Sequence, residues 1–293
     1  MHSGMLSRDY RQAPDTALVL EGGGLRGIWS AGVTDRFMDL GITFPYIIGV
    51  SMGSVIGASY VSRQRGRFIS FLQENLRDPR YMSWRNFLLE GNYFGRRFAY
   101  DLAPRRCCPF DFKAYYATPE RLISTATDLE TGKPAYFEKN EGQLSAIIGA
   151  SSAIPYVTKP IEVNGRYYLD GGMSDSVPIE KALRDGNHKA VLVLTRPRGY
   201  RKEPYGHPNL ARLWYRKYPK LAESILNRHK GYNRTMDLID VMEDRGEIFV
   251  IRPERPIRSN MLNKDLADVE DHYNDGYAFM KKTEDDLKHY IDR

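Results

Sequence analysis

A serine lies between two glycines in the segment Gly49-Val-Ser-Met-Gly53, which has the spacing G-x-S-x-G. This spacing is typical of a tight turn between a strand and a helix that exposes the serine hydroxyl, because larger flanking side chains would collide with neighbouring backbone. The apolar run Tyr46-Ile-Ile48 precedes the motif, and a helical pattern over residues 52–63 follows it. Ser51 is therefore the candidate nucleophile, at a helix N-terminus where free N–H groups, including that of Met52, can stabilise negative charge.

A second motif, Glu21-Gly-Gly-Gly-Leu-Arg-Gly27, follows the apolar run Ala17-Leu-Val-Leu20. Its glycines spell G-x-G-x-x-G, a pattern that also occurs in loops that bind the pyrophosphate of dinucleotides. Such a fold requires an acidic residue about 20 positions further on, at the end of the next strand. Here that strand runs into the serine motif without an Asp or Glu. A dinucleotide-dependent oxidoreductase is therefore the least favoured of the possible functions.

The glycine-rich loop is better suited to an oxyanion. Consecutive glycines let main-chain N–H groups approach a reacting carbonyl where a Cβ would block them. We expect these donors from the three consecutive glycines, with Arg26 holding the loop or adding positive charge. The alternative is a turn that only links a strand to a helix. The expected oxyanion loop comprises Gly22, Gly23, Gly24, Leu25, Arg26 and Gly27.

A nucleophilic serine needs a base, and none of the six histidines stands in a motif typical of a catalytic triad. His188 precedes an apolar strand, so it would lie at the wrong end of the sheet. Asp170 instead follows the apolar run Tyr167-Tyr-Leu169 and precedes Gly171 and Gly172. Asp170 is therefore the candidate base, at the carboxyl end of its strand.

Short apolar runs alternate with helical patterns, which predicts an α/β fold with a mainly parallel central sheet flanked by helices. The expected strands cover residues 18–20, 46–48, 122–125, 167–169, 191–195 and 248–251, and the expected helices cover 27–40, 52–63, 144–149 and 178–185. Reactive groups in such sheets lie at the carboxyl ends of the strands. The expected organisation is an N-terminal tail (1–16), a catalytic domain (17–196) and a helical C-terminal extension (197–293) packed on that domain.

Within this extension, residues 264–293 have apolar positions at near-helical spacing, which predicts one or two amphipathic helices. Residues 199–235 show no clear period and are expected to be helical or loop-rich. From Arg196 to Arg234 there are eleven Lys or Arg against two Glu, with aromatic residues interleaved. On charge grounds this segment suits anionic lipid headgroups or nucleic-acid phosphates, or forms a solvated face.

Composition excludes several other classes of protein. The two cysteines, Cys107 and Cys108, are adjacent, and they form neither a disulfide framework nor a zinc motif. We therefore expect a cytoplasmic protein without metal or cofactor. Residues 40–62 are uncharged and contain glycines at four-residue spacing, but Pro45 and several serines argue against a membrane helix. The first 15 residues contain no apolar leader segment.

Together the motifs resemble those of patatin-like phospholipases, of the bacterial kind with a C-terminal extension. The glycine-rich loop, the serine motif and Asp170-Gly-Gly172 occur in the family's order over roughly the first 195 residues, and residues 149–157, GASSAIPYV, resemble the segment before its aspartate strand. The resemblance implies a three-layer fold and a Ser-Asp dyad without histidine. Ser51 then attacks an ester carbonyl, and Asp170 accepts its proton and later activates water. One departure is Ser176, where family members often have asparagine.

Two functions follow as hypotheses. The first is a serine lipid acyl hydrolase that cleaves phospholipids or other fatty-acyl esters and contacts anionic membrane surfaces peripherally through its basic residues. The second is a catalytically silent protein on the same fold that binds membrane or nucleic acid. Nucleic acid is the weaker partner because no recognised binding motif is present. No oligomeric state is predicted.

Overall fold

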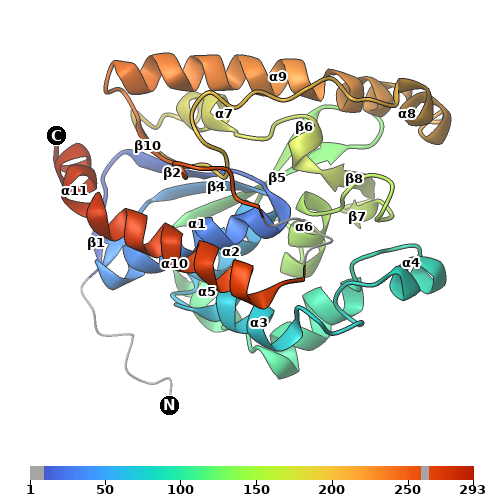
Figure 1. The fold of residues 1–293 in the computed structure, drawn as a ribbon, viewed down its shortest axis with the longest axis horizontal. Coiled ribbons are helices and arrows are strands. Elements are labelled where there is room, and N and C mark those ends of the chain that lie inside the picture. Colours follow the sequence, from blue (N-terminus) through green and yellow to red (C-terminus); the bar gives the residue numbers. More distant parts are fainter. Residues whose placement is uncertain (1–9, 259–263) are drawn as a thin grey trace.

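The computed structural model describes residues 10–258 and 264–293 (Figure 1). Residues 1–9, most of the expected tail, lie outside the described residues, as does His2. The main sheet has eight strands in the order β10-β9-β2-β4-β5-β8-β7, and β6 pairs with β5. Their bounds are β2 Thr16–Leu20, β4 Tyr46–Val50, β5 Arg121–Asp128, β6 Pro134–Glu138, β7 Ile161–Val163, β8 Arg166–Asp170, β9 Lys189–Val193 and β10 Phe249–Ile251. A separate pair joins β1 (Arg11–Gln12) to β3 (Ile42–Thr43).

The helices cover both faces of the main sheet. They are α1 Gly27–Asp39, α2 Met52–Val61, α3 Arg67–Asn75, α4 Trp84–Glu90, α5 Phe112–Ala117, α6 Leu144–Ser151, α7 Ile179–Arg184, α8 Pro208–Trp214, α9 Pro219–Asp244, α10 Leu266–Lys282 and α11 Glu284–Asp292. A π-helical segment spans Phe98–Cys107, and 3-10 turns span Gly24–Arg26 and Gly171–Met173. None of the helices in the described ranges is long and apolar enough to cross a membrane.

The parallel half of the sheet confirms the expected fold class. Strands β10, β9, β2, β4 and β5 are parallel neighbours, and every residue of β2 and β4 is buried. Successive residues of β2 alternate between the faces. Leu18 and Leu20 pack with α1, α2 and α10, whereas Ala17 and Val19 pack with α7 and α9. Figure 1 shows α9 and α10 on opposite sides of the sheet, so the three layers are helix, sheet and helix.

The other half of the sheet is antiparallel, which the sequence analysis did not predict. β6 and β8 both run antiparallel to β5, and β7 runs antiparallel to β8. The turn between β7 and β8 contains Asn164 and Gly165, both with positive φ. Asn-Gly is the preferred sequence of a two-residue hairpin, and a connection this short permits only antiparallel pairing.

Pairing along β5 brings two strand ends together. β4 pairs with the first part of β5, up to Val50 opposite Thr125, and β8 pairs with its last part, down to Asp170 opposite Ala126. Since β6 shares partners on β5 with both strands, β6 occupies one edge of β5 and β4 and β8 share the other. The carboxyl ends of β4 and β8 therefore meet head to head, at adjacent residues of β5.

The C-terminal third of the chain contributes to all three layers. β10 extends the sheet beside β9, α9 covers one face, and α10 packs on α1 on the other. Two helices lie where no helical period was recognised, and each begins with a proline, Pro208 in α8 and Pro219 in α9. Proline is favourable at the first position of a helix, because its missing N–H would have no partner there.

The crossing of α1 and α10 depends on two glycines. A Cβ on Gly32 would lie 2.1 Å from the carbonyl oxygen of Tyr273, and a Cβ on Gly276 would lie 2.0 Å from that of Trp29. Both contacts are with backbone, so neither can be relieved by a side-chain rotation. The two helices therefore approach more closely than any larger residue permits.

We expect Gly276→Ala to destabilise the protein by about 1–3 kcal/mol, because the added methyl forces α10 away from α1. Gly231→Ala is the matched control, since Gly231 lies in α9 with nothing within 4 Å of an added Cβ. The control should stabilise by about 0.5–1 kcal/mol through helix propensity. Urea unfolding measures both changes, and equal free energies of unfolding would contradict the packing argument.

Candidate active site

Ser51 occupies a strained turn between β4 and α2. Its φ of 54° and ψ of −121° are unusual for a residue with a side chain, as expected for a G-x-S-x-G turn. A Cβ on Gly49 would lie 2.6 Å from the Gly53 backbone, and a Cβ on Gly53 would lie 2.3 Å from the Leu20 carbonyl oxygen. The two glycines thus allow the turn to pack against β2 and hold Ser51 at the carboxyl end of β4.

A second serine fixes this turn. The backbone N–H of Ser51 donates to Ser151 Oγ at 2.8 Å, and Ser151 Oγ donates to the Thr125 carbonyl at 2.7 Å. Ser54 Oγ lies 2.9 Å from the same hydroxyl and serves as its second donor. Ser151 ends α6, within the GASSAIPYV segment, and it joins α6, the serine turn and β5. No role for Ser151 could be predicted from the sequence, because its partners Ser51 and Thr125 are remote along the chain.

Asp170 lies at the head-to-head junction and faces the serine. Ser51 and Asp170 are both buried and line the same pocket, and the serine hydroxyl acts on the aspartate carboxylate to lower its pKa. The Gly172 N–H donates to Asp170 Oδ1 at 2.7 Å, which orients the carboxylate. A Cβ on Gly171 would lie 2.2 Å from the Thr125 carbonyl oxygen, so only glycine fits there. The structure thus brings together the predicted nucleophile and base, from strands that run in opposite directions.

The surroundings of Asp170 act on its pKa in opposite directions. Burial raises the pKa above the ordinary aspartate value, and this effect dominates. The interactions with the Ser51 hydroxyl and the Gly172 N–H oppose it and lower the pKa, as do the positive charges of Arg228 and Lys202. The carboxylate is therefore a stronger base than an exposed aspartate.

The glycine-rich loop lies directly beside Ser51. A Cβ on Gly22 would lie 2.9 Å from the Val50 carbonyl oxygen, and one on Gly23 would lie 2.8 Å from Thr195 Oγ1. Gly24 has a φ of 56°, in the left-handed region that favours glycine. Within the described ranges, no acceptor binds the main-chain N–H groups of Gly22, Gly23, Gly24 and Met52. These groups are therefore free to donate to a ligand.

The remaining loop residues have separate positions. Leu25 is buried in the core, and Gly27 begins α1, where a Cβ would lie 2.4 Å from Met52 Cγ. Arg26 is partly buried and lines a pocket next to Ser51. Burial lowers the pKa of Arg26, and its Nε is buried without a hydrogen-bond partner among the described residues.

Glu21 anchors the loop, a role that was not predicted. Its buried carboxylate accepts hydrogen bonds from the Thr195 N–H at 2.6 Å and from the Tyr232 hydroxyl at 3.0 Å. Tyr232 belongs to α9, so the C-terminal part of the chain braces the loop next to the nucleophile. The EGGG sequence contained this residue, but its partners lie more than 170 positions away.

Two pockets of opposite chemistry meet at Ser51. The first is apolar and lies among α2, α3, α6 and the π-helical segment, with Val55, Phe68, Phe71, Tyr100, Leu144 and Ile148 in its lining. The second is basic and is lined by Arg26, Lys202 and Arg228 as well as by Asp170. Ser51, Gly24 and Ile154 line both. An amphiphilic molecule can therefore place its apolar part in one pocket and its polar part in the other, with the bond between the two parts at Ser51.

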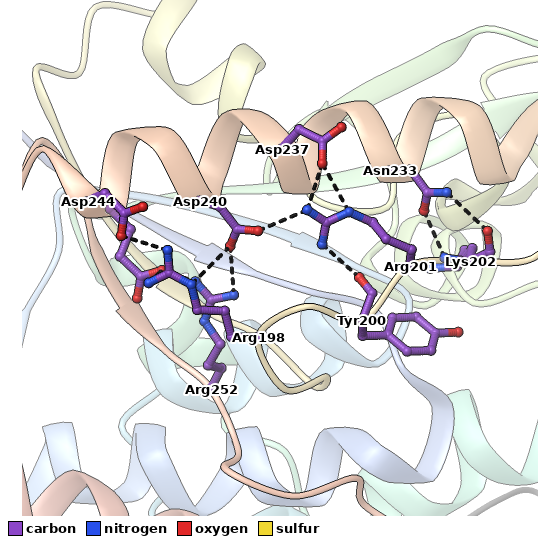
Figure 2. A network of polar contacts seen from close by, with 10 residues as sticks. Arg198, Tyr200, Arg201, Lys202, Asn233, Asp237, Asp240, Asp244 and Arg252 are labelled. Carbon is purple, nitrogen blue, oxygen red and sulfur yellow. Dashed lines mark hydrogen bonds and ion pairs between the residues drawn. The ribbon is translucent and has the colours of Figure 1, made fainter.

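Part of the basic segment from Arg196 to Arg234 is paired with acidic residues and does not form one exposed charged face. Arg201 binds Asp237 at 2.6 Å and Asp240 at 2.9 Å, and Arg198 binds Asp244 at 2.6 Å (Figure 2). All three aspartates project from α9 toward the segment that follows β9. The eleven cations therefore do not form a uniform patch.

Other candidate residues lie away from this centre. His188 immediately precedes β9, at the opposite end of that strand from the glycine-rich loop. No histidine of the described chain lines either pocket at Ser51. A search of the described residues found no group of three His, Cys, Asp or Glu side chains arranged to hold a metal ion.

Comparison with known families agrees with this geometry. Residues 18–183 match the model of the patatin-like phospholipase family, which is more than half of the chain. The chain belongs to the patatin-like phospholipase family. Residues 218–292 match a second model, a domain of unknown function designated DUF6363. The patatin-like match contains Ser51 and Asp170, whereas α9 and α10 belong to the second match.

Related proteins show how far the likeness extends. The uncharacterized protein YjjU of Escherichia coli is 26% identical over 88% of this chain and 73% of its own length. An uncharacterized NTE family protein of Mycobacterium tuberculosis is 30% identical over 57% of this chain and 45% of its own. Lysophospholipase NTE1 of Kluyveromyces lactis is 24% identical over 89% of this chain, which spans only 18% of that protein.

Ser176, the departure from the common patatin-like pattern, supports the end of the aspartate motif. Its Oγ donates to the Gly172 carbonyl at 2.8 Å, and Arg228 Nε donates to the same oxygen at 2.5 Å. The turn that presents the Asp170 carboxylate is therefore held by one residue of the patatin-like match and one of α9.

We expect Ser151→Ala to destabilise the protein by about 1–3 kcal/mol, because the buried N–H of Ser51 loses the acceptor that it has among the described residues. Ser54→Ala is the comparison, since Ser151 then keeps its bonds to Ser51 and Thr125, and a loss of about 1 kcal/mol or less is expected. Urea unfolding of both variants measures the difference. A larger loss for Ser54→Ala would show that Ser151 is not the anchor of the turn.

Proposed function

We propose that the protein is a serine lipid acyl hydrolase in which Ser51 is the nucleophile and Asp170 the base. The observation that carries this proposal is the strained, buried Ser51, which shares a pocket with an aspartate carboxylate of raised pKa and lies beside a loop whose N–H groups have no acceptor among the described residues. The family membership supports a lipid hydrolase in general.

The reaction proceeds in two halves. Ser51 Oγ attacks the ester carbonyl carbon while Asp170 accepts the hydroxyl proton, and the intermediate collapses to an acyl-serine as the departing alcohol takes that proton. Water then attacks the acyl-serine and gives a proton to Asp170. Release of the fatty acid returns this proton to Ser51 Oγ, so the enzyme is regenerated without metal or cofactor.

The oxyanion of each tetrahedral intermediate is stabilised by main-chain donors. The N–H groups of Gly22, Gly23, Gly24 and Met52 are the candidates, since they lie around Ser51 and have no other acceptor among the described residues. The N–H of Ser51 itself is excluded because it donates to Ser151. Loss of one such donor typically lowers turnover by about 100- to 1000-fold.

The substrate is an amphiphile with a fatty-acyl chain. The apolar pocket receives the chain and the basic pocket receives the polar part, which leaves the ester carbonyl at Ser51. The related protein of Kluyveromyces lactis is named a lysophospholipase, so a monoacyl phospholipid is the first substrate to test.

Two exposed apolar helices suit contact with a lipid surface. Leu88 of α4 is 83% exposed and Leu213 of α8 is 69% exposed, and each helix also exposes a tryptophan, Trp84 and Trp214. Five exposed cations without an ion-pair partner among the described residues lie on or beside these helices. They are Arg85, Arg212, Arg216, Lys217 and Lys220.

The same chain segment connects both helices to the active site. The Tyr93 N–H donates to the Val157 carbonyl, and Tyr93 packs on Trp84 of α4. The neighbouring Tyr156 packs on Trp214 of α8, with ring centroids 5.8 Å apart. Ile154, two residues earlier, lines both pockets at Ser51. We infer that α4 and α8 dock on an anionic lipid surface and that lipid enters beside this segment.

We expect Ser51→Ala and Asp170→Asn each to lower the hydrolysis of a monoacyl phospholipid by at least about a thousandfold, because the two groups act as a unit. The double variant should be no less active than either single one. Asp175→Asn is the matched control, since Asp175 is also buried, with a pKa raised to about 6 by that burial. Released fatty acid measures activity, and circular dichroism checks folding. Full activity of Ser51→Ala would falsify the proposal.

The pH dependence tests the base separately. Only ionised Asp170 accepts the serine proton, so kcat/KM must fall as the pH falls through the pKa of Asp170. Because burial raises that pKa, the acidic limb should lie above the value of ~3.9 for an exposed aspartate. A constant kcat/KM down to this value would contradict the assignment of Asp170.

We expect Leu88→Asp combined with Leu213→Asp to weaken binding to vesicles of anionic lipid by at least about tenfold, because each leucine contributes about 1.5–3 kcal/mol when buried in lipid. Val241→Asp is the matched control, because Val241 is an exposed aliphatic residue near the C-terminal end of α9, whereas α8 precedes the N-terminal end of that helix. Vesicle sedimentation measures binding. Equal binding of all three proteins would exclude α4 and α8 as the docking surface.

A further inference from the structure

The basic pocket beside Ser51 has a feature that ester hydrolysis alone does not require. Three cations line it, and they come from three separate parts of the chain. Arg26 belongs to the glycine-rich loop, Lys202 to the segment after β9, and Arg228 to α9. The sole carboxylate in the lining is that of Asp170.

The cations next to the pocket differ from those that line it, because they form ion pairs with acids. Arg198 and Arg201 form ion pairs with aspartates of α9, as does Arg252 (Figure 2). In contrast, neither Arg26, Lys202 nor Arg228 forms an ion pair with any carboxylate of the described chain. The acids of α9 thus pair with the outer arginines, whereas no carboxylate of the described chain pairs with the inner cations.

Arg228 interrupts the apolar face of α9. Ile225, Tyr232, Met236 and Ile239 are buried at helical spacing, and Arg228 occupies the position between Ile225 and Tyr232. An arginine on the inward stripe of a helix is costly unless it has a partner. Its Nε is bound to the Gly172 carbonyl, while its Nη2 approaches the position of a Cβ on Gly172 to 3.2 Å.

Lys202 is positioned from its backbone. Its N–H donates to Asn233 Oδ1 at 2.7 Å, and its carbonyl accepts from Asn233 Nδ2 at 3.1 Å (Figure 2). The ammonium lies 3.0 Å from the centre of the Tyr232 ring. Burial lowers the pKa of Lys202 well below its usual value, and the nearby arginines lower it further. A bound anion would favour its charged form.

Positive charge exceeds negative charge around this pocket. The cations that act on one another here are Arg26, Lys202, Arg228 and Arg196, whereas the acids are Asp170 and Glu21. Glu21 already accepts from Thr195 and Tyr232. Repulsion among four cations against two carboxylates is relieved by an anionic ligand.

We propose that this pocket binds the phosphate of a lipid headgroup and selects headgroups with no compensating cation. A lipid whose ester lies at Ser51 and whose chain enters the apolar pocket places its polar end among Arg26, Lys202 and Arg228. A phosphomonoester fits this surplus of positive charge. A choline headgroup does not, because the lining offers its ammonium no aromatic ring and no acid besides Asp170. The proposal rests on the proposed acyl hydrolase.

The test compares three monoacyl esters with the same chain, which carry a phosphomonoester, a phosphocholine or an uncharged glycerol. We expect wild type to favour the phosphomonoester by about tenfold in kcat/KM, mainly through KM, as for one charge-assisted contact. Lys202→Met should remove most of this preference, and Lys202→Arg should retain more of it. Arg198→Met is the matched control, since Arg198 is paired with Asp244 outside the pocket, and the preference should remain. Equal kcat/KM for the three esters, or an unchanged preference in Lys202→Met, overturns the proposal.

A binding measurement separates this proposal from the catalytic one. Ser51→Ala protein is titrated calorimetrically with a non-hydrolysable ether-linked monoacyl phosphomonoester, with its uncharged analogue and with inorganic phosphate. Tighter binding of the phosphomonoester, lost when Lys202→Met is added, supports the pocket even if no ester is hydrolysed. Phosphate that binds as tightly as the phosphorylated lipid assigns the site to free phosphate and overturns the lipid headgroup. Equal binding of both lipids also overturns it.

Discussion

One edge of β5 brings Ser51 and Asp170 together. It carries the ends of two strands that run in opposite directions, so Val50 and Asp170 lie opposite neighbouring residues of the same strand. A parallel sheet alone would place Ser51 and Asp170 at the carboxyl edge of the sheet but would not bring the two side chains to the same point. The antiparallel β8 delivers its last residue directly to the end of β4. A shift of β8 by one residue would turn the Asp170 side chain to the other face of the sheet.

The strain at Ser51 has to be held by the surroundings. A side chain at a φ of 54° costs of order 1–3 kcal/mol and persists only where other contacts determine the backbone. Ser151 supplies one such contact from α6, and the packing of Gly53 on Leu20 supplies another from β2. Both contacts join the turn to elements that lie on opposite sides of it. The hydroxyl is thereby held at one position relative to Asp170.

The sequence predicted the parts of the site that depend on local spacing. The glycines around Ser51 and in the loop stand in short motifs with a fixed spacing, so their pattern could be recognised, although most of the contacts that require glycine are with residues remote in sequence. The antiparallel pairing of β8 was not, although Asn164-Gly165 is a hairpin signal. Likewise, the inward stripe of α9 through Ile225, Tyr232 and Ile239 has a helical period. This period was not recognised, and the glycines, prolines and basic residues of the segment led only to the expectation that it is helical or loop-rich.

The cations of the basic pocket affect the base as well as the polar end of a substrate. Arg228 and Lys202 lower the pKa of Asp170 while burial raises it, so these two cations weaken the carboxylate as a base. An anion bound between these cations offsets their charge and leaves the effect of burial less opposed. The base then becomes stronger when the pocket is filled. In the proposed mechanism, the residues proposed to bind the polar end thereby also couple its binding to proton transfer from Ser51.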